Sequence, residues 1–136
     1  MSIETFADLL AVARSQREPQ RLLFVFAVAE LPHDGSASEA AAFQRGEGGT
    51  LAPVVCVDKL ATEVDSFEAL RAESRESISR WDILFVAALG GRAGMAPNSD
   101  EAAAPLRKMV ESIRVGHIGN FLAVNRDGEL VRLERR

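Results

Sequence analysis

The stretch Arg21-Leu-Leu-Phe-Val-Phe-Ala-Val-Ala29 decides the fold class, because it is short, rich in Val and Phe, and apolar on both faces. This is the pattern of a central strand that is covered on both sides. Ile83-Leu-Phe-Val-Ala-Ala-Leu89 has the same character, and Pro53-Val-Val-Cys-Val57 has the composition of another strand. These runs predict a buried sheet.

Apolar residues at helical spacing surround these strands. They predict three helices, over Ser2 to Ser15, Ser66 to Arg80 and Ser99 to Val115. The strands and helices alternate, and two strand–helix–strand units favour parallel pairing in the middle of the sheet.

The end of the chain has a hairpin signal. Asp127-Gly128 lies between the apolar runs 121–124 and 130–133, and this dipeptide is typical of tight turns between antiparallel strands. We therefore expect an α/β fold of α+β character. It would contain a mixed sheet of about five strands, helices packed on that sheet, and a C-terminal β-hairpin.

The same patterns predict the core. Residues on the apolar strands or on the helix stripes should be buried, namely Phe24, Phe26, Val55, Phe85, Val110 and Ile113. Cys56 lies among valines, so we expect a buried and unreactive thiol.

Length and composition predict one domain over residues 1–136, soluble and of the bacterial cytoplasmic type. The formal net charge of −4 disfavours binding to nucleic acid, which needs a basic surface. The longest apolar run, Leu22 to Ala29, is too short to span a bilayer, and the acidic start of the chain is unlike a signal peptide. The single cysteine suits a reducing compartment.

No motif predicts a metal or a cofactor. The two histidines, His33 and His117, have no partner at metal-ligand spacing, and one thiol cannot build a zinc site. We therefore expect no catalytic residue, no metal and no cofactor.

The segment 31–50 is a long insert loop between two strands. Ser38 to Arg45 has the composition of a short helix, and Gly46-Glu-Gly-Gly49 is more typical of a hinge than of a phosphate loop. Long connections of this kind are usually functional or mobile.

The most suggestive site is Gly90-Gly-Arg-Ala-Gly94, which follows an apolar strand and precedes a helix. Backbone N–H groups of Gly90 and Gly91, together with the charge of Arg92, could bind an anionic ligand. Asp58 and Lys59 end another strand, and they would share that sheet edge if the two strands run the same way. Alternatively, the glycines form only a connecting turn, and Asp58 and Lys59 only a solvated strand end.

Four stretches resemble a small uncharacterised proteobacterial family that often carries the label ribonucleotide reductase subunit alpha. They are Arg21 to Pro32, Gly46 to Lys59, Phe85 to Gly94 and Met109 to Arg114. The resemblance covers nearly the whole chain. The reductase reaction needs a radical-forming cysteine and a redox-active cysteine pair, which a chain with one cysteine lacks, so no catalytic residue is carried over.

The order of elements is also similar to that of SseB-like bacterial domains. The best local match is the closing hairpin, Phe121 to Leu133. This likeness implies a fold and no activity.

Together these observations predict a non-catalytic binding or accessory module for a partner protein or a small anionic ligand. The alternative is a small enzyme or nucleotide-binding regulator with its site at Asp58, Lys59 and Gly90 to Arg92. The oligomeric state stays open.

Overall fold

The computed structural model describes residues 3–30, 50–78 and 80–133. Within them, five strands form one sheet in the order β2-β1-β3-β4-β5. Their bounds are β1 (Gln20–Glu30), β2 (Thr50–Leu60), β3 (Ile83–Gly90), β4 (Leu122–Val124) and β5 (Leu130–Val131).

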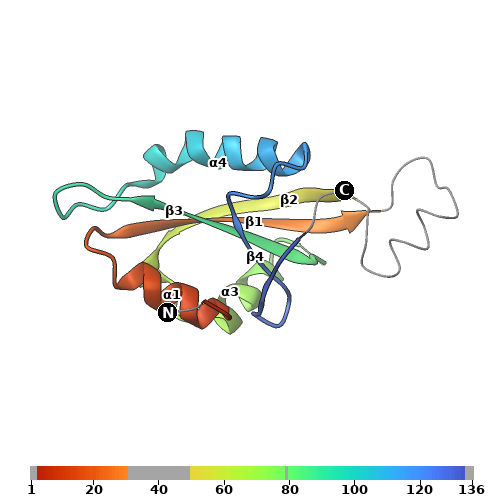
Figure 1. The fold of residues 1–136 in the computed structure, drawn as a ribbon, viewed down its shortest axis with the longest axis horizontal. Helices are drawn as coiled ribbons and strands as arrows, with labels where there is room; N and C mark the ends of the chain where they lie inside the picture. Colours follow the sequence, from red (N-terminus) through yellow and green to blue (C-terminus); the bar gives the residue numbers. More distant parts are fainter. Residues whose placement is uncertain (1–2, 31–49, 79, 134–136) are drawn as a thin grey trace, which may run out of the picture.

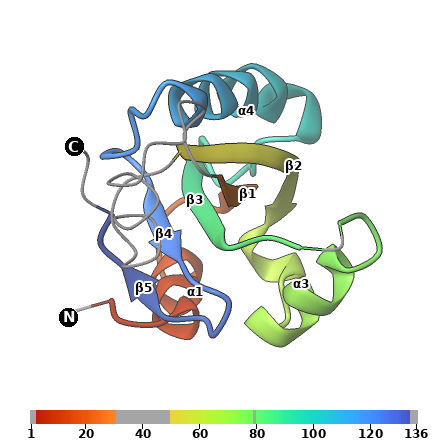
Figure 2. The same ribbon diagram turned by 90° about the vertical axis from the view of Figure 1, so that its right-hand side faces the viewer.

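Helices cover both faces of this sheet. The helix α4 (Ser99–Arg114) lies on one face, and α1 (Phe6–Arg14) and α3 (Phe67–Ser74) lie on the other (Figures 1 and 2). A short 3-10 turn, η1 (Ala61–Glu63), joins β2 to α3. The predicted α+β fold, with about five strands, packed helices and a closing hairpin, is confirmed.

The prediction of parallel pairs in the middle of the sheet is wrong, because every pair of neighbouring strands is antiparallel. The strands β2 and β3, joined through α3, do run in the same direction. However, β1 lies between them and pairs with both. The sequence pattern identified the crossover connection but could not show that an earlier strand occupies the middle position.

The two sheet faces bury two separate clusters. Alternation along β1 sends Leu22, Phe24 and Phe26 toward α1 and α3, and sends Leu23 and Val25 toward α4. A strand that contributes to both clusters must be apolar on both faces, which explains the uninterrupted run in β1.

The predicted core is confirmed at Phe24, Phe26, Phe85 and Ile113, which are buried. Val55 and Val110 are only half-buried. The predicted burial of Cys56 is wrong, because the residue is exposed. Val55 and Cys56 lie on β2, and an edge strand has a neighbour on one side only.

Two helix boundaries differ from the prediction at their starts. Thr5 caps α1 through the backbone N–H of Asp8, so the helix begins at Phe6. Asn98, and not Ser99, caps α4, with Glu101 completing a capping box. The side chain of Ser99 is therefore free to bond elsewhere.

The second predicted helix does begin after Ser66, but α3 ends at Ser74 instead of Arg80. The chain turns so that Trp81 enters the core, where its ring lies 5.1 Å from that of Phe26. The indole N–H donates to the hydroxyl of Ser74 at 3.1 Å. Core packing therefore ends this helix early.

The closing hairpin is present at the predicted turn. Gly128 has a φ of +83°, which favours glycine, and Asn125 accepts hydrogen bonds from the backbone N–H groups of Asp127 and Glu129. The predictions for the 31–50 insert, including Ser38 to Arg45, Gly46 to Gly49 and His33, fall on residues 31–49 and so lie outside the described residues.

Candidate functional site

The C-terminal ends of β2 and β3 lie at the same end of the sheet, as the site prediction required. Arg21 of β1 separates them, because it pairs with Leu60 of β2 on one side and Leu89 of β3 on the other. The predicted residues Asp58 and Gly90 therefore belong to one end of the molecule but are not neighbours.

Asp58 is held by two other side chains. Arg21 donates from Nε to Oδ2 of Asp58 at 2.7 Å, and the hydroxyl of Ser99 donates to the same oxygen at 2.6 Å. Arg21 also donates to the carbonyl of Pro97 at 3.3 Å. This Arg21–Asp58–Ser99 cluster ties β1, β2 and the start of α4 together.

The electrostatics of this cluster argue against acid–base chemistry. Burial alone would raise the pKa of Asp58, but the hydrogen bonds from Ser99 and Arg21 and the charge of Arg21 outweigh burial, so the pKa is lowered. A carboxylate with a lowered pKa is a poor general base. The short contact to the Ser99 hydroxyl therefore does not activate a nucleophile.

Lys59 points to the other side of the sheet from Asp58, as successive strand residues do. Its ammonium group lies 3.0 Å from a carboxylate oxygen of Glu73 on α3. Asp58 and Lys59 therefore do not form one binding site, although they are adjacent in sequence.

The glycine loop forms a tight turn that projects beyond the sheet (Figure 1). The N–H of Gly91 donates to the carbonyl of Pro19 at 2.9 Å, and Arg92 and Met95 exchange backbone hydrogen bonds of 3.0 and 2.9 Å. A side chain at Gly91 would place its Cβ 2.2 Å from the carbonyl oxygen of Met95. Close backbone packing explains this glycine.

The centre of the turn has the geometry of hairpin turns. Ala93 and Gly94 have φ values of +52° and +80°, and the N–H of Gly94 donates to the carboxylate of Glu18 at 2.8 Å. The N–H groups of Gly91, Arg92 and Gly94 thus all donate to acceptors within the chain and are not available to an anion. The side chain of Arg92 is exposed.

A groove that sequence reasoning missed lies along β4 and β5, and residues from both faces of the sheet contribute to its lining. Its volume is about 530 Å³, and we call it the β4–β5 groove. Its lining includes the exposed Arg132 and several apolar residues, among them Phe85, Ile118, Phe121, Leu122, Val131 and Leu133. Phe121 and the residues of β5 are half-buried, and Leu122 is 41% exposed. The only sequence signal was the apolar composition of the two hairpin strands.

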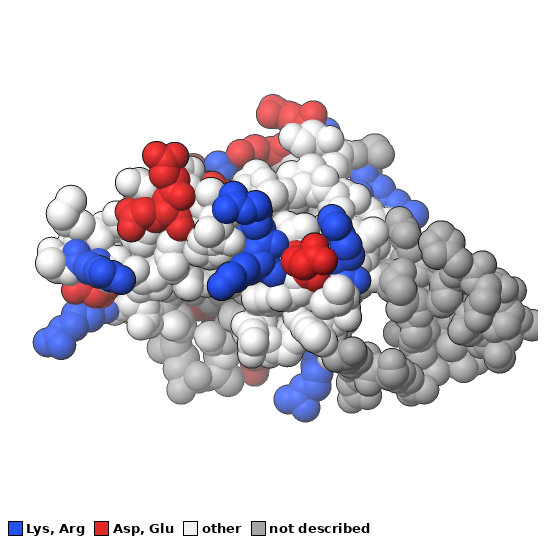
Figure 3. All heavy atoms as spheres, turned by 90° about the horizontal axis from the view of Figure 1, so that it is seen from above, with Lys and Arg blue, Asp and Glu red and all other residues white. Residues whose placement is uncertain are grey.

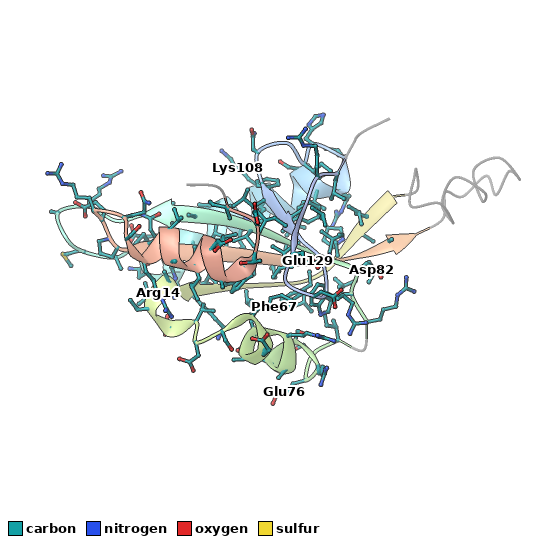
Figure 4. The ribbon with its side chains drawn as sticks, turned by 60° about the horizontal axis from the view of Figure 1, so that its bottom comes forward. Arg14, Phe67, Glu76, Asp82, Lys108 and Glu129 are labelled. Atoms are coloured by element: carbon teal, nitrogen blue, oxygen red, sulfur yellow. The ribbon has the colours of Figure 1, made fainter. Side chains whose placement is uncertain are left out.

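A second hollow, of about 420 Å³, lies between α1 and α3. Figure 4 shows this side of the molecule, with Arg14 and Phe67 between the two helices. Arg14 donates to the carbonyl groups of Ala61 and Val64, so its guanidinium closes the turn after β2. This hollow is therefore bordered by a structural arginine.

The described part of the chain holds no candidate metal site. It contains no group of three His, Cys, Asp or Glu side chains placed to hold a metal ion. His117 is exposed, and its backbone N–H bonds to the carbonyl of Ser112. No helix in the described ranges is long and apolar enough to cross a membrane.

Comparisons with known proteins add no family. No protein-family model, curated protein or solved structure matches the chain. The resemblances drawn from the sequence therefore stay expectations, and function has to be inferred from the described residues.

Proposed function

We propose that this chain is a non-catalytic binding module for a partner protein, and that the β4–β5 groove receives apolar side chains of that partner. The observation that carries this proposal is the exposure of apolar residues that line the groove, where Leu122 is 41% exposed and Phe121 and Val131 are half-buried. Clustered apolar exposure of this kind favours an interaction surface.

The shape of the groove favours a protein partner over a small molecule. Sites for small ligands usually enclose most of the ligand surface. Here Leu122 and half-buried side chains such as Phe121 border an open surface beside an edge strand, β5. A partner segment can lie along such a surface, whereas a small ligand would stay largely in water.

The cytoplasm is the compartment we propose. The support is the single cysteine, which cannot form an internal disulfide, and the exposed position of Cys56, which would be open to oxidation outside a reducing compartment.

The hypothesis that the chain binds a small anionic ligand at Gly90, Gly91 and Arg92 stays a prediction. The internal acceptors for the N–H groups of Gly91 and Gly94 weaken its physical basis, while the exposed guanidinium of Arg92 keeps it testable. A thermal-shift screen with phosphate, nucleotides and phosphorylated metabolites should show no stabilisation. A ligand whose affinity falls in Arg92→Ala would instead support the anion site.

Site-specific photo-crosslinking tests the partner proposal. A photoreactive amino acid at position 122 should capture one defined protein from the native cells. The matched control carries the same group in place of Met95, whose residue is 75% exposed on the projecting turn. Since Met95 is the more exposed residue, nonspecific capture would be stronger there than at Leu122.

Binding of the purified partner then decides the question. Titration calorimetry should show affinity for the wild-type chain and a loss of about tenfold or more for Leu122→Glu, because the new charge would enter an apolar contact. Equal capture at positions 122 and 95, or unchanged affinity of Leu122→Glu, would rule out the groove as the binding surface.

A further inference from the structure

The side of β2 that faces away from β1 pairs with no strand of the described residues. Within the described residues, β1 is the one strand that pairs with β2, which is 11 residues long. Val54 is 44% exposed on this strand, and Cys56 is exposed as well. A long apolar edge strand is a template for pairing with another chain.

Backbone hydrogen bonds alternate in direction along each strand, and this alternation shows which backbone groups of β2 face away from β1. The bond from Gly91 to Pro19 continues the β1–β3 ladder, so alternate residues from Pro19 onward direct their backbone groups to β3. The intervening residues of β1 bond to Val55, Val57 and Lys59 of β2. The N–H and C=O of Cys56 therefore point away from the sheet. The pairing with β1 skips Val54, the extra residue of a bulge beside Pro53, so regular strand geometry begins at Val55.

The flank of α4 beside this edge carries complementary charges. The hydroxyl of Ser99 reaches Asp58 of β2, so the flank of the helix that contains Ser99 lies on the β2 side. Helical spacing adds Asp100, Ala103 and Arg107 to this flank. Figure 3 shows acidic atoms over the start of α4 and mainly basic atoms over its second half.

We propose that β2 pairs antiparallel with β2 of a second copy of the chain, across a two-fold axis near Cys56. Two-fold pairing brings the same surface of each copy together, so one edge strand and one helix flank complete the contact. The two sheets would become one continuous sheet, with the two α4 helices side by side and antiparallel on the same face.

In that arrangement, opposite charges on the two α4 helices face each other. Asp58 lies two residues, or about 6.6 Å, from the axis at about 3.3 Å per residue. Since Ser99 contacts Asp58, the same distance along α4, at about 1.5 Å per residue, brings the axis near Ala103. Asp100 of each copy then lies opposite Arg107 of the other copy, and the small exposed Ala103 lets the helices approach.

Light scattering on the full chain tests the pairing. At micromolar concentrations the wild type should have a mass of about 29 kDa, twice the 14.7 kDa of one chain. Cys56→Glu would place like charges across the axis and should weaken self-association by about tenfold or more. Met95→Glu adds the same charge on the projecting turn and should leave the dimer intact. Circular dichroism checks that each variant is folded.

A charge swap on α4 separates this contact from a general loss of stability. Arg107→Asp should weaken the dimer, and the double variant Asp100→Arg with Arg107→Asp should restore it, because the opposing charges exchange places. Leu122→Glu in the β4–β5 groove should leave the dimer unchanged, so this inference can fail without the proposed function failing. A monomeric wild type, or a dimer insensitive to both Cys56→Glu and Arg107→Asp, would overturn the pairing.

Discussion

The guanidinium Nε of Arg21 lies 2.7 Å from Oδ2 of Asp58, and this pair joins the central strand to the edge strand where the sheet meets α4. The side chains of Arg21 and Asp58 are only 13% and 21% exposed. Residues predicted to form a ligand site thus include one that is already engaged in holding the fold together.

Asp58→Asn is expected to lower the free energy of unfolding by about 1–3 kcal/mol, because it removes the charge that Arg21 faces and at least one of two hydrogen bonds. Chemical denaturation measures this loss. Glu76→Gln, at an exposed residue of the segment after α3, is the matched control and should change stability by less than about 0.5 kcal/mol. Equal effects of the two substitutions would contradict the role given to Asp58.

The contribution of Asp58 should depend on pH with a defined sign. Its pKa is lower in the folded chain than the ordinary value of 3.8, so the ionised carboxylate stabilises the fold above that value. The stabilisation is lost as the pH falls through the folded pKa. The stability difference between wild type and Asp58→Asn should therefore be largest near neutral pH and shrink below about pH 4. A difference that grows on acidification would refute this assignment.

Ser74→Ala should destabilise the chain by about 1–3 kcal/mol, because it leaves the buried N–H of Trp81 without its hydroxyl acceptor. The chain has one tryptophan, so its fluorescence reports both the unfolding transition and the indole environment. Ser77→Ala, at an exposed serine three residues later, serves as the control. An unchanged emission spectrum and midpoint in Ser74→Ala would show that the bond contributes nothing.

Replacing Ala93 in the projecting turn should make the folded chain more stable. Its φ of +52° is strained for alanine, so Ala93→Gly or Ala93→Asn should raise the free energy of unfolding by up to about 1 kcal/mol. Ala103→Gly within α4 makes the same kind of change in a helix and should cost about 1 kcal/mol. Gly91→Ala should disrupt the turn, since its Cβ would clash with the carbonyl of Met95. Thermal melts of these four variants should therefore shift in the stated directions.

Phe85→Ala should cost about 3–5 kcal/mol, because this fully buried ring lies between β3 and α4 and leaves a cavity when removed. Urea denaturation gives the value. Val54→Ala on the exposed edge strand should cost far less. A loss below about 1 kcal/mol for Phe85→Ala would mean that the ring is not part of the core.

Several elements could be predicted because local sequence determines them. The two-sided apolar runs of β1 and β3 identified the central strands, and Asp127-Gly128 identified the hairpin turn, since positive φ values favour glycine there. The apolar stripe predicted a helix over Ser99 to Val115, which agrees with the bounds of α4 to within one residue. In each case the evidence lies within a few neighbouring residues.

The sites were harder to predict, because they depend on which elements become neighbours. Nothing near Asp58 in the sequence indicates Arg21 or Ser99, which lie 37 and 41 residues away along the chain. The predicted burial of Cys56 failed for the same reason, since valine neighbours in the sequence do not tell a central strand from an edge strand such as β2. The groove formed by Phe121, Leu122 and Leu133 needs the hairpin to be placed beside β3.

By itself, the sequence determined the class of this protein, because apolar periodicity and turn residues fix helices and strands through local physics. It also determined which strands are apolar on both faces. Only the tertiary structure decided the strand order, the antiparallel pairing and therefore which strand is left at the edge. Strand order depends on the summed burial of surfaces from distant segments, such as the placement of β1 between β2 and β3. That sum has no local signature, so the groove and the open edge of β2 became visible only in the folded chain.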